Sequence, residues 1–297
     1  MTTPTEQRNP RTLAIDAVGT SEILQMVNAE DARVAGAVAA AIPDLARAVD
    51  AAVEAIRGGG RVHYFGAGTS GRLAVLDAAE LLPTFHAPDG LVVAHHAGGI
   101  DALLRAVENV EDSEEGGVAD ATAVTGQDLV IGLAASGSTP YVAGALKAAR
   151  EAGATTVLVT SNPAAPLAPL ADIVIAADTG PEVIAGSTRL KAGTAQKMIL
   201  NAFSTTLMIK LGRTWSNLMV DLVATNKKLR GRMLRILGEA TGADPEACES
   251  ALAAAEGELK PALVHLLTGS PIPAARAALD AAHGRVATAL ATLGAPA

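Results

Sequence analysis

The stretch Arg61–Gly71, RVHYFGAGTSG, decides the fold, because a short β-prone run leads into a glycine-rich turn. Residues 61–65 carry the branched and aromatic side chains that are common in strands, and the turn begins at Gly66. After Gly71 the apolar residues recur at helical spacing as far as Glu80. A strand, a tight turn and a helix in this order are typical of an α/β fold with a parallel sheet.

The same alternation continues along the chain. Further strands are predicted at residues 91–94, 128–133, 155–160 and 172–176. Helices are predicted at residues 71–80, 100–109, 141–152 and 188–210. Nearly continuous apolar strands indicate burial on both faces of the sheet. The pattern therefore predicts a three-layer α/β/α fold with a parallel sheet covered on both sides.

Helical sequence flanks this α/β region. The first dozen residues are polar and are interpreted as an arm; Asn28, with Asp31 three residues later, predicts one helix start, and Pro43 predicts the next. Beyond about Thr225 the chain is rich in Ala, Leu and Glu and is interrupted at residues 242–245 and 269–271. We expect an N-terminal arm with helices over residues 1–50, the α/β domain over 51–225, and a small helical subdomain over 226–297.

Composition excludes several classes of protein. Of the 297 residues 49% are hydrophobic and 18% charged, so a core can form and bulk disorder is excluded. A net charge of −8 with 2% aromatic residues disfavours nucleic-acid binding, which needs a positive field and stacking side chains. No apolar run reaches the roughly 18 residues of a membrane span, and the polar start is no secretory signal. We expect a cytoplasmic protein with no membrane partner.

Cysteine and histidine give no metal or redox site. Cys248 is the single cysteine, which excludes an internal disulfide framework. His95 and His96 are adjacent, so they point to opposite faces of a strand and lack metal-ligand spacing. His63 lies within the first predicted strand and is interpreted as a packed, hydrogen-bonded residue. We therefore expect no metal.

The turn at residues 66–71 has the spacing of an anion-binding loop. Its glycines let the backbone approach a ligand, and the following helix N-terminus supplies free N–H donors. A dinucleotide would need a carboxylate at the end of the second strand. That strand instead ends in residues 94–97, Ala-His-His-Ala. NAD binding is disfavoured, and a single phosphate is favoured.

Two more turns resemble the first. Residues 134–140, Ala-Ala-Ser-Gly-Ser-Thr-Pro, follow a predicted strand, and residues 186–188, Gly-Ser-Thr, precede the long helix. Hydroxyls there can bind a phosphate or a sugar, because each donates and accepts. For any one turn, helix capping is an alternative explanation. Three turns at the carboxyl ends of parallel strands favour a ligand site, with these candidate binding residues: Gly68, Thr69, Ser70, Gly71, Ser136, Gly137, Ser138, Thr139 and Ser187.

Longer strings carry a family resemblance. The Ser-Gly turns resemble the sugar isomerase (SIS) domain, a phosphosugar-binding α/β fold. GAGTSGRLAVLDAAELLPTF, GPEVIAGSTRLKAGTAQKMILN and NLMVDLVATNKKL resemble the N-acetylmuramic acid 6-phosphate etherase family, and the likeness runs from the TEQRNPRT arm to the helical tail. The resemblance implies a homodimer that uses no metal or organic cofactor. It also implies cleavage of the lactyl ether of N-acetylmuramic acid 6-phosphate to N-acetylglucosamine 6-phosphate and D-lactate, in cell-wall sugar recycling.

The resemblance also implies two catalytic carboxylates. Ether cleavage by elimination needs a base for the proton beside the open-chain aldehyde and an acid for the departing oxygen. The family's acid falls on Glu80 and its second carboxylate, the base, on Glu111. From residue patterns alone, Glu80 reads as a solvated helix end. Glu111 belongs to an acidic run that reads as a solvated face.

Two further residues are candidates for substrate binding. Lys191 can reach a phosphate or carboxylate from the long helix, or be an exposed helical cation. Glu182 can orient a sugar hydroxyl or cap a strand end. Two positions depart from the family pattern: Ser138 stands where Arg is common, and Ala79 where Ser is frequent. These departures affect the expected affinity more than the expected reaction.

Two other functions remain open at this stage. A phosphosugar-responsive regulatory protein similar to the glucokinase regulatory protein shares the ancestry, but it would need a second SIS domain for which this chain has no room. An aldose–ketose isomerase on the same fold also needs a base beside an open-chain sugar. The long family strings favour the etherase over both.

Overall fold

The computed structural model describes residues 3–105, 107–222 and 227–295. The chain forms two compact units: the first is Met1–Ala79 with Asp89–Ser204, and the second is Glu80–Pro88 with Thr205–Ala297. The expected boundary between residues 225 and 226 lies outside the described residues.

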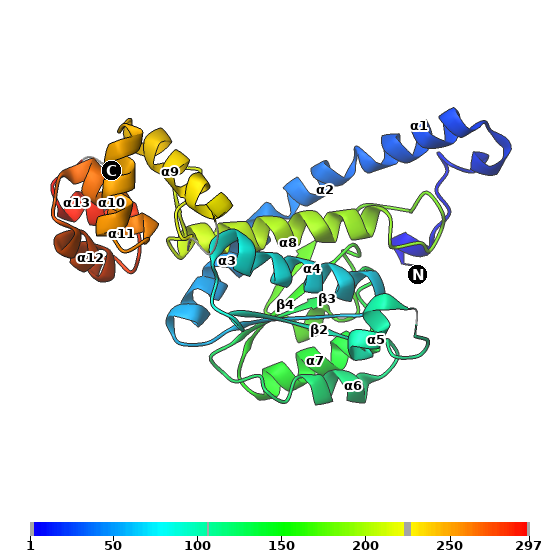
Figure 1. Cartoon of the computed structure of the whole chain (residues 1–297). Helices are drawn as coiled ribbons and strands as arrows, with labels where there is room; N and C mark the ends of the chain where they lie inside the picture. Colours follow the sequence, from blue (N-terminus) through cyan, green and yellow to red (C-terminus); the bar gives the residue numbers. More distant parts are fainter. Residues whose placement is uncertain (1–2, 106, 223–226, 296–297) are drawn as a thin grey trace. The chain divides into compact units, whose positions relative to one another are not determined.

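A five-stranded sheet forms the centre of the first unit (Figure 1). Its strands are β1 (Val62–Gly66), β2 (Val92–His96), β3 (Leu129–Leu133), β4 (Thr155–Thr160) and β5 (Ile173–Ala176). All neighbours pair in parallel in the order β2-β1-β3-β4-β5. The predicted parallel sheet is therefore confirmed. The strand order reverses between β1 and β3, and open α/β sheets bind ligands at such a point.

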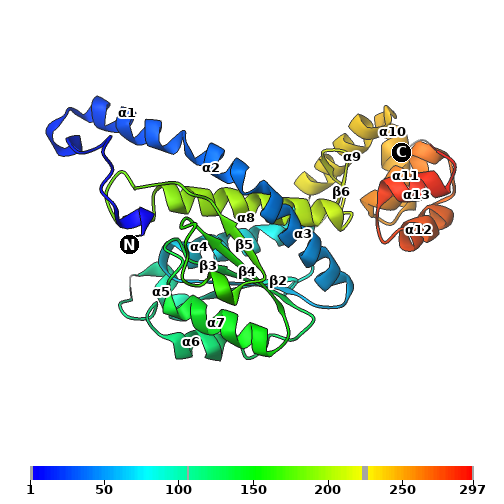
Figure 2. The same ribbon diagram turned by 180° about the vertical axis from the view of Figure 1, so that it is seen from behind.

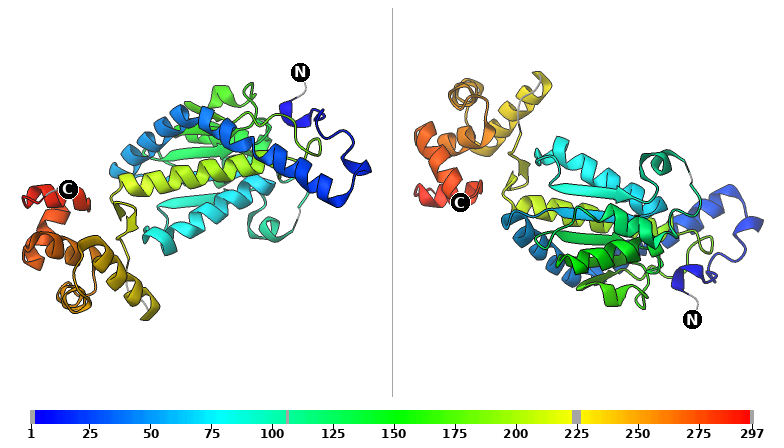
Figure 3. Two further views of the ribbon diagram at one scale, coloured as in Figure 1. Left: turned by 90° about the horizontal axis from the view of Figure 1, so that it is seen from above. Right: turned by 90° about the horizontal axis from the view of Figure 1, so that it is seen from below.

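Helices cover both faces of the sheet, as expected for three layers (Figures 1 and 2). On one face lie α5 (Gly99–Leu104), α6 (Glu114–Asp120) and α7 (Pro140–Glu151). On the other lie α3 (Ile42–Arg57), α4 (Gly68–Phe85) and α8 (Lys191–Lys210). Figure 3 shows α8 running along the sheet between α3 and α4.

Side chains alternate in direction along β1, so neighbouring residues pack into the hydrophobic cores on the two faces of the sheet. Tyr64 donates its hydroxyl to Asp77 Oδ2 of α4 at 3.1 Å and meets the ring of Phe203 in α8 edge-on. Phe65 points to the opposite face, where its ring centroid lies 6.4 Å from that of Tyr141 in α7. Both β1 side chains are fully buried. This two-sided burial explains why the strand has no polar alternation.

The N-terminal arm contains two short 3₁₀ helices, η1 (Pro4–Glu6) and η2 (Ile15–Ala17), and leads into α1 (Thr20–Asp31) and α2 (Val34–Ala40). The predicted helix start at Asn28 is wrong, because this residue lies inside α1. Apolar residues before Asn28 already recur at helical spacing, and this pattern outweighs one capping residue. The start predicted at Pro43 is accurate, since α3 begins one residue earlier.

The region after β2 also differs from the prediction. The helix expected over residues 100–109 ends at Leu104, where Arg105 turns to extended backbone. Asn109 has a φ of 66°, in the left-handed region, so the helix cannot continue there. The acidic run beyond it is partly helical, because Ser113 caps α6 by accepting from the N–H of Gly116 at 3.0 Å.

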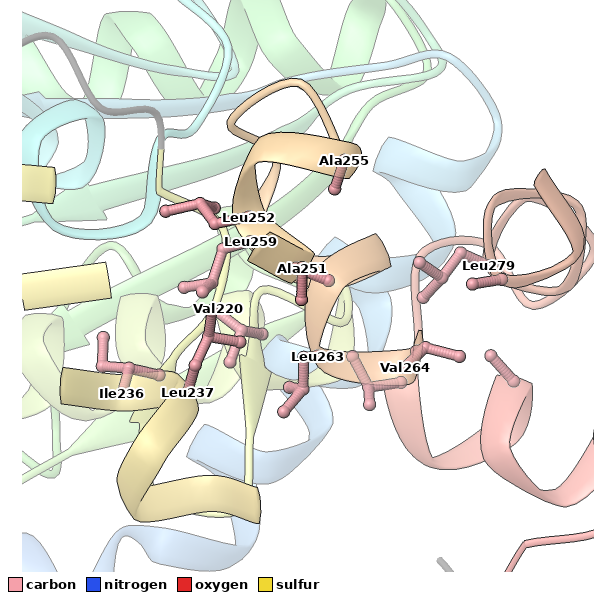
Figure 4. Close-up of a cluster of buried hydrophobic side chains, with 14 of the residues drawn as sticks. Val220, Ile236, Leu237, Ala251, Leu252, Ala255, Leu259, Leu263, Val264 and Leu279 are labelled. Atoms are coloured by element: carbon pink, nitrogen blue, oxygen red, sulfur yellow. The ribbon is translucent and has the colours of Figure 1, made fainter. Parts of the chain in front are cut away.

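The second unit is mostly helical, as predicted. A hairpin of β6 (Thr214–Trp215) and β7 (Leu218–Met219) precedes its helices. These are α9 (Lys227–Thr241), α10 (Pro245–Ala254), α11 (Leu259–Thr268), α12 (Ile272–Ala281) and α13 (Val286–Thr292). Leu237, Leu252 and Leu263 are among the buried side chains that pack between them (Figure 4). No helix among the described residues is long and apolar enough to cross a membrane.

Candidate functional site

A cavity of about 510 Å³ opens in the first unit where β1 and β3 end. It therefore lies at the reversal of strand order, the place where ligands bind in open α/β sheets. Three turns, one acidic segment and the N-terminal arm line it, through Glu6, Ala67, Gly68, Thr69, Ser70, Glu111, Asp112, Ala135, Ser136, Ser138, Thr139, Pro140, Gly186 and Thr188.

The turn after β1 is closed by glycine contacts. A Cβ on Gly71 would lie 2.4 Å from the carbonyl oxygen of Gly66, so only glycine fits at this position. The buried His96 ring supports the turn from β2, with Nε2 3.3 Å from the carbonyl oxygen of Gly68. Gly68, Thr69 and Ser70, the first residues of α4, line the cavity from this rigid turn.

The hydroxyl of Ser70 has a partner on α8. It donates to Gln196 Oε1 at 2.9 Å, and both side chains are buried. Because its one proton is engaged, the Ser70 oxygen keeps its lone pairs for accepting a hydrogen bond. Ser70 is therefore suited to a ligand hydroxyl or N–H.

The turn after β3 is equally constrained. Gly137 has a φ of 72°, and a Cβ there would lie 2.3 Å from that of Ala165. The hydroxyls of Ser136 and Ser138 are 2.9 Å apart, so they form one polar group at the cavity wall. Thr139 is the N-cap residue of α7, but its side chain makes no capping hydrogen bond. Capping thus does not account for the hydroxyl of Thr139 at this turn.

The third turn contributes through two of its three residues. Gly186 and Thr188 line the cavity, whereas Ser187 does not. The Gly186 N–H donates to the carbonyl oxygen of Thr5 at 2.9 Å, which ties this turn to the N-terminal arm. The predicted turn therefore lies at the cavity, but its lining residues are Gly186 and Thr188 rather than Ser187.

The cavity has an acidic side and, among the described residues that line it, no Lys, Arg or His. Glu111 and Asp112 lie there, and the Glu111 carbonyl oxygen accepts the N–H of Tyr141 at 3.0 Å. No group of three His, Cys, Asp or Glu residues in the described parts of the chain is placed to hold a metal ion. The described lining therefore offers an anion only backbone N–H groups and hydroxyls as donors.

Glu80 lies elsewhere. It is an exposed residue of α4, belongs to the second compact unit, and is absent from the described lining of the cavity. It is ten residues further along α4 than Ser70, the last residue of this helix that lines the cavity. The structure thus brings Glu111 to the cavity but does not bring Glu80 of the same chain to its lining.

Lys191 and Glu182 also lie outside the described cavity lining, and both are fully buried. Lys191 Nζ donates to Glu30 Oε2 at 2.6 Å. Glu182 accepts the backbone N–H groups of Lys191 and Ala192 at 2.9 Å each, so it caps α8. Both side chains are engaged in holding the start of α8 rather than in facing the cavity.

Glu30 is the centre of that buried cluster. It accepts hydrogen bonds from Arg11, Lys191 and Asn9. These hydrogen bonds lower the pKa of Glu30 to about 2. The bond from Arg11 is the main cause, and the bonds from Lys191 and Asn9 add to it. Sequence patterns missed this residue because nothing in the chain nearby indicates that α1 packs against a buried lysine.

A second buried polar cluster lies on the sheet. His63 Nδ1 and His95 Nε2 are 3.0 Å apart, and the ring of His95 stacks on Phe65 with centroids 4.2 Å apart. Burial, together with the neighbouring His63, lowers the pKa of His95 to about 4. The two rings are held by packing, which agrees with the interpretation of His63 as a structural residue.

Glu6 and Asp112 are cavity residues that the sequence patterns did not single out. Gly186 and Thr188 belong to the predicted third turn, although only Ser187 of that turn was a candidate binding residue. Asp112 was read as part of a solvated acidic run. Glu6 lies in the TEQRNPRT arm, which is part of the sequence likeness to the family, and this likeness is the feature of the sequence that could have indicated it. The arm's return to the cavity could not be inferred from local pattern.

Comparison with known families fits this fold and site. Residues 44–150 match the model of the glucokinase regulatory protein N-terminal SIS domain, and residues 103–206 match the SIS domain. A phosphoheptose isomerase from Francisella tularensis has the same fold, with a TM-score of 0.54, 19% identity, and coverage of 65% of this chain and all of that one. The α/β unit is a SIS domain.

Closer relatives define the family. An N-acetylmuramic acid 6-phosphate etherase from Thermobifida fusca is 62% identical over 89% of this chain and 87% of its own length. One from Salmonella dublin is 54% identical over 96% of this chain and 97% of its own. The chain belongs to the N-acetylmuramic acid 6-phosphate etherase family.

Proposed function

We propose that this protein cleaves the D-lactyl ether of N-acetylmuramic acid 6-phosphate, giving N-acetylglucosamine 6-phosphate and D-lactate in the recycling of cell-wall sugars. Family membership over nearly the whole chain supports the reaction. The observation that carries the proposal is a cavity that combines hydroxyl-rich turns at two helix N-termini with the carboxylate of Glu111.

The phosphate is bound at the turns after β1 and β3. Backbone N–H groups at the start of α4 attract an anion. The helix α7 begins at Pro140, which has no N–H, and the N–H of Tyr141 is donated to the Glu111 carbonyl oxygen, so the turn after β3 contributes through its hydroxyls. Ser136, Ser138 and Thr139 add hydroxyls at the same wall. Ser138 stands where the family commonly has Arg, so the cradle uses neutral donors in place of that charge. Ser70 and Thr188 are placed to contact the sugar.

Cleavage proceeds by elimination and then hydration. A base removes the proton on the carbon next to the open-chain aldehyde, and the lactyl oxygen leaves from carbon 3 as it takes up a proton. Water then adds to carbon 3 of the unsaturated aldehyde. We assign the base to Glu111 and the acid to Glu80; each proton transfer contributes roughly 10²–10⁴-fold to the rate.

A homodimer accounts for the position of Glu80. Glu80 lies on an exposed face of α4 one turn after Leu76, which is 53% exposed. Large exposed apolar side chains in one helix are suited to contact with a second copy of the chain. We propose that Glu80 acts on the substrate in the cavity of the partner subunit.

Product analysis tests the reaction. The full chain is incubated with N-acetylmuramic acid 6-phosphate in ¹⁸O-water, and the products are examined by mass spectrometry. Elimination followed by hydration places the label on carbon 3 of the sugar and leaves the former ether oxygen of lactate unlabelled. Label in the lactate would contradict this mechanism, and the absence of any lactate would contradict the proposed function.

Mixing two variants tests the shared site. Glu80→Gln and Glu111→Gln should each release almost no lactate, at least 10²-fold less than the wild type. After the two are unfolded and refolded together, half of the dimers are mixed, and each holds one intact site. Lactate release should return to about one quarter of the wild-type rate. If both carboxylates act from one chain, the mixture stays inactive.

A further inference from the structure

The side chain of Glu6 forms part of the cavity wall and has no role in the proposed proton transfers or phosphate binding. Glu6 is the last residue of η1 in the N-terminal arm. Its carboxylate lies over the third turn, because a Cβ added to Gly186 would be 3.0 Å from Glu6 Oε2. The arm, which is distant in sequence from the other lining segments, therefore brings a carboxylate to the ligand space.

The arm is fixed by bonds that do not involve the Glu6 side chain. The Thr5 carbonyl oxygen accepts from Gly186 N–H at 2.9 Å, and Thr5 is fully buried. Thr12 Oγ1 donates to the carbonyl oxygen of Val183 at 2.9 Å, and Asn9 Nδ2 donates to that of Pro181 at 3.2 Å. Glu6 is thus held in place by its backbone, and its side chain remains available to a ligand.

The chemistry of a carboxylate limits what it can bind. An ionised carboxylate only accepts hydrogen bonds, and no Lys, Arg or His among the described lining residues neutralises it. It disfavours direct contact with an anionic group, such as the phosphate or the lactyl carboxylate of the substrate. The groups of the substrate that suit it are the uncharged donors, namely the sugar hydroxyls and the acetamido N–H.

We propose that Glu6 is a specificity-determining residue that accepts a hydrogen bond from a hydroxyl or the acetamido N–H of the bound sugar phosphate. This inference rests on the proposed function, since it takes the ligand to be an amino-sugar phosphate. Glu6 selects sugars that present a donor at the arm and disfavours ligands with a second anionic group there.

Calorimetric titration of the full chain tests this role, with N-acetylglucosamine 6-phosphate and inorganic phosphate as separate probes. Glu6→Ala should weaken binding of the sugar phosphate about tenfold or more, the loss expected for a hydrogen bond to a charged group. Binding of inorganic phosphate should be unchanged. Glu6→Gln keeps one acceptor oxygen and should lose less. Glu22→Ala, which removes an exposed carboxylate in α1, is the matched control and should resemble the wild type.

Three outcomes would overturn the inference. Equal sugar-phosphate binding by wild type and Glu6→Ala means that Glu6 makes no contact. Weaker binding of both probes means that the variant disturbs the cradle. Tighter binding of inorganic phosphate means that Glu6 faces the phosphate. Lactate release by the wild type is measured in parallel, so failure of the proposed function is detected independently of the result for Glu6.

Discussion

Lys191 Nζ lies 2.6 Å from Glu30 Oε2, and both side chains are buried. The pair connects the start of α8 to the end of α1, and Arg11 and Asn9 of the arm complete the cluster. Because the arm also carries Glu6, the bonds from Asn9 and Arg11 to Glu30 help to hold the arm that contributes to the cavity lining. The contribution of the cluster is to stability and to the placing of the arm.

Removing Glu30, the acidic partner, should therefore destabilise the folded protein. Glu30→Ala leaves the Lys191 ammonium buried without its carboxylate, and we expect a loss of about 3–5 kcal/mol in the free energy of unfolding. Urea denaturation measures it, with Glu22→Ala of the same helix as the control. A loss no greater than that of the control would show that the cluster does not stabilise the fold.

Removing the basic partner should be milder. Lys191→Met fills a similar volume, and Glu30 keeps its bonds from Arg11 and Asn9. We expect a smaller loss of stability than for Glu30→Ala and an unchanged KM for N-acetylmuramic acid 6-phosphate. A KM raised tenfold or more with stability intact would restore the substrate-binding role that sequence patterns gave to Lys191.

Acid should weaken the same cluster. The pKa of Glu30 is lowered to about 2 in the folded protein, below its value of roughly 4.3 in an unfolded chain. The stabilisation is complete above the unfolded value and is lost as pH falls from there towards 2. Unfolding free energies measured between pH 5 and 2 should fall more steeply for the wild type than for Glu30→Gln. Parallel curves would contradict this expectation.

His95 gives a second pH dependence in a different range. Burial lowers its pKa to about 4, whereas an unfolded histidine titrates near roughly 6.5. The unfolded chain then takes up a proton that the folded chain does not, so stability falls as pH decreases from about 6.5 to 4. His95→Phe, which keeps a ring against Phe65, should flatten this part of the curve. An unchanged slope would show that His95 is not its source.

Glu182 should behave as a helix cap. Its two carboxylate oxygens each accept one buried N–H at the start of α8. Glu182→Gln has a single acceptor oxygen, leaves one N–H unpaired, and should lower stability by about 1–3 kcal/mol. Thermal unfolding measures this loss. A fully stable variant with impaired substrate binding would support instead the sugar-orienting role considered from the sequence.

The fold could be predicted because its signals are local. The short strand that ends at Gly66 is buried along its whole length, and Gly71 closes a turn that no other residue fits. The predicted ends of the helices were less accurate. Asn28 resembles an N-cap residue but lies inside α1, and Asn109, expected to be helical, has a positive φ. Such details depend on backbone conformation, which composition and periodicity do not determine.

The site could be predicted only where it follows a strand. The turns with Ser70 and Ser136 line the cavity as expected. Lys191 reads as a surface cation because its burial depends on Glu30, 161 residues away in the chain. Glu6 was missed for the same reason, since the arm's return to Gly186 is a long-range contact. The roles of Glu80 and Glu111 remain proposals that the variants above test.

The absence of basic side chains among the described lining of the cavity bears on how such a protein can diverge. In the proposed function the phosphate is held in part by main-chain N–H groups at the start of α4. Such groups are present in every residue except proline, so most point mutations would leave them intact. Glu6 and the hydroxyl-bearing residues have no such protection. Evolution can therefore alter which sugar is accepted, one codon at a time, while the attachment to phosphate is inherited unchanged.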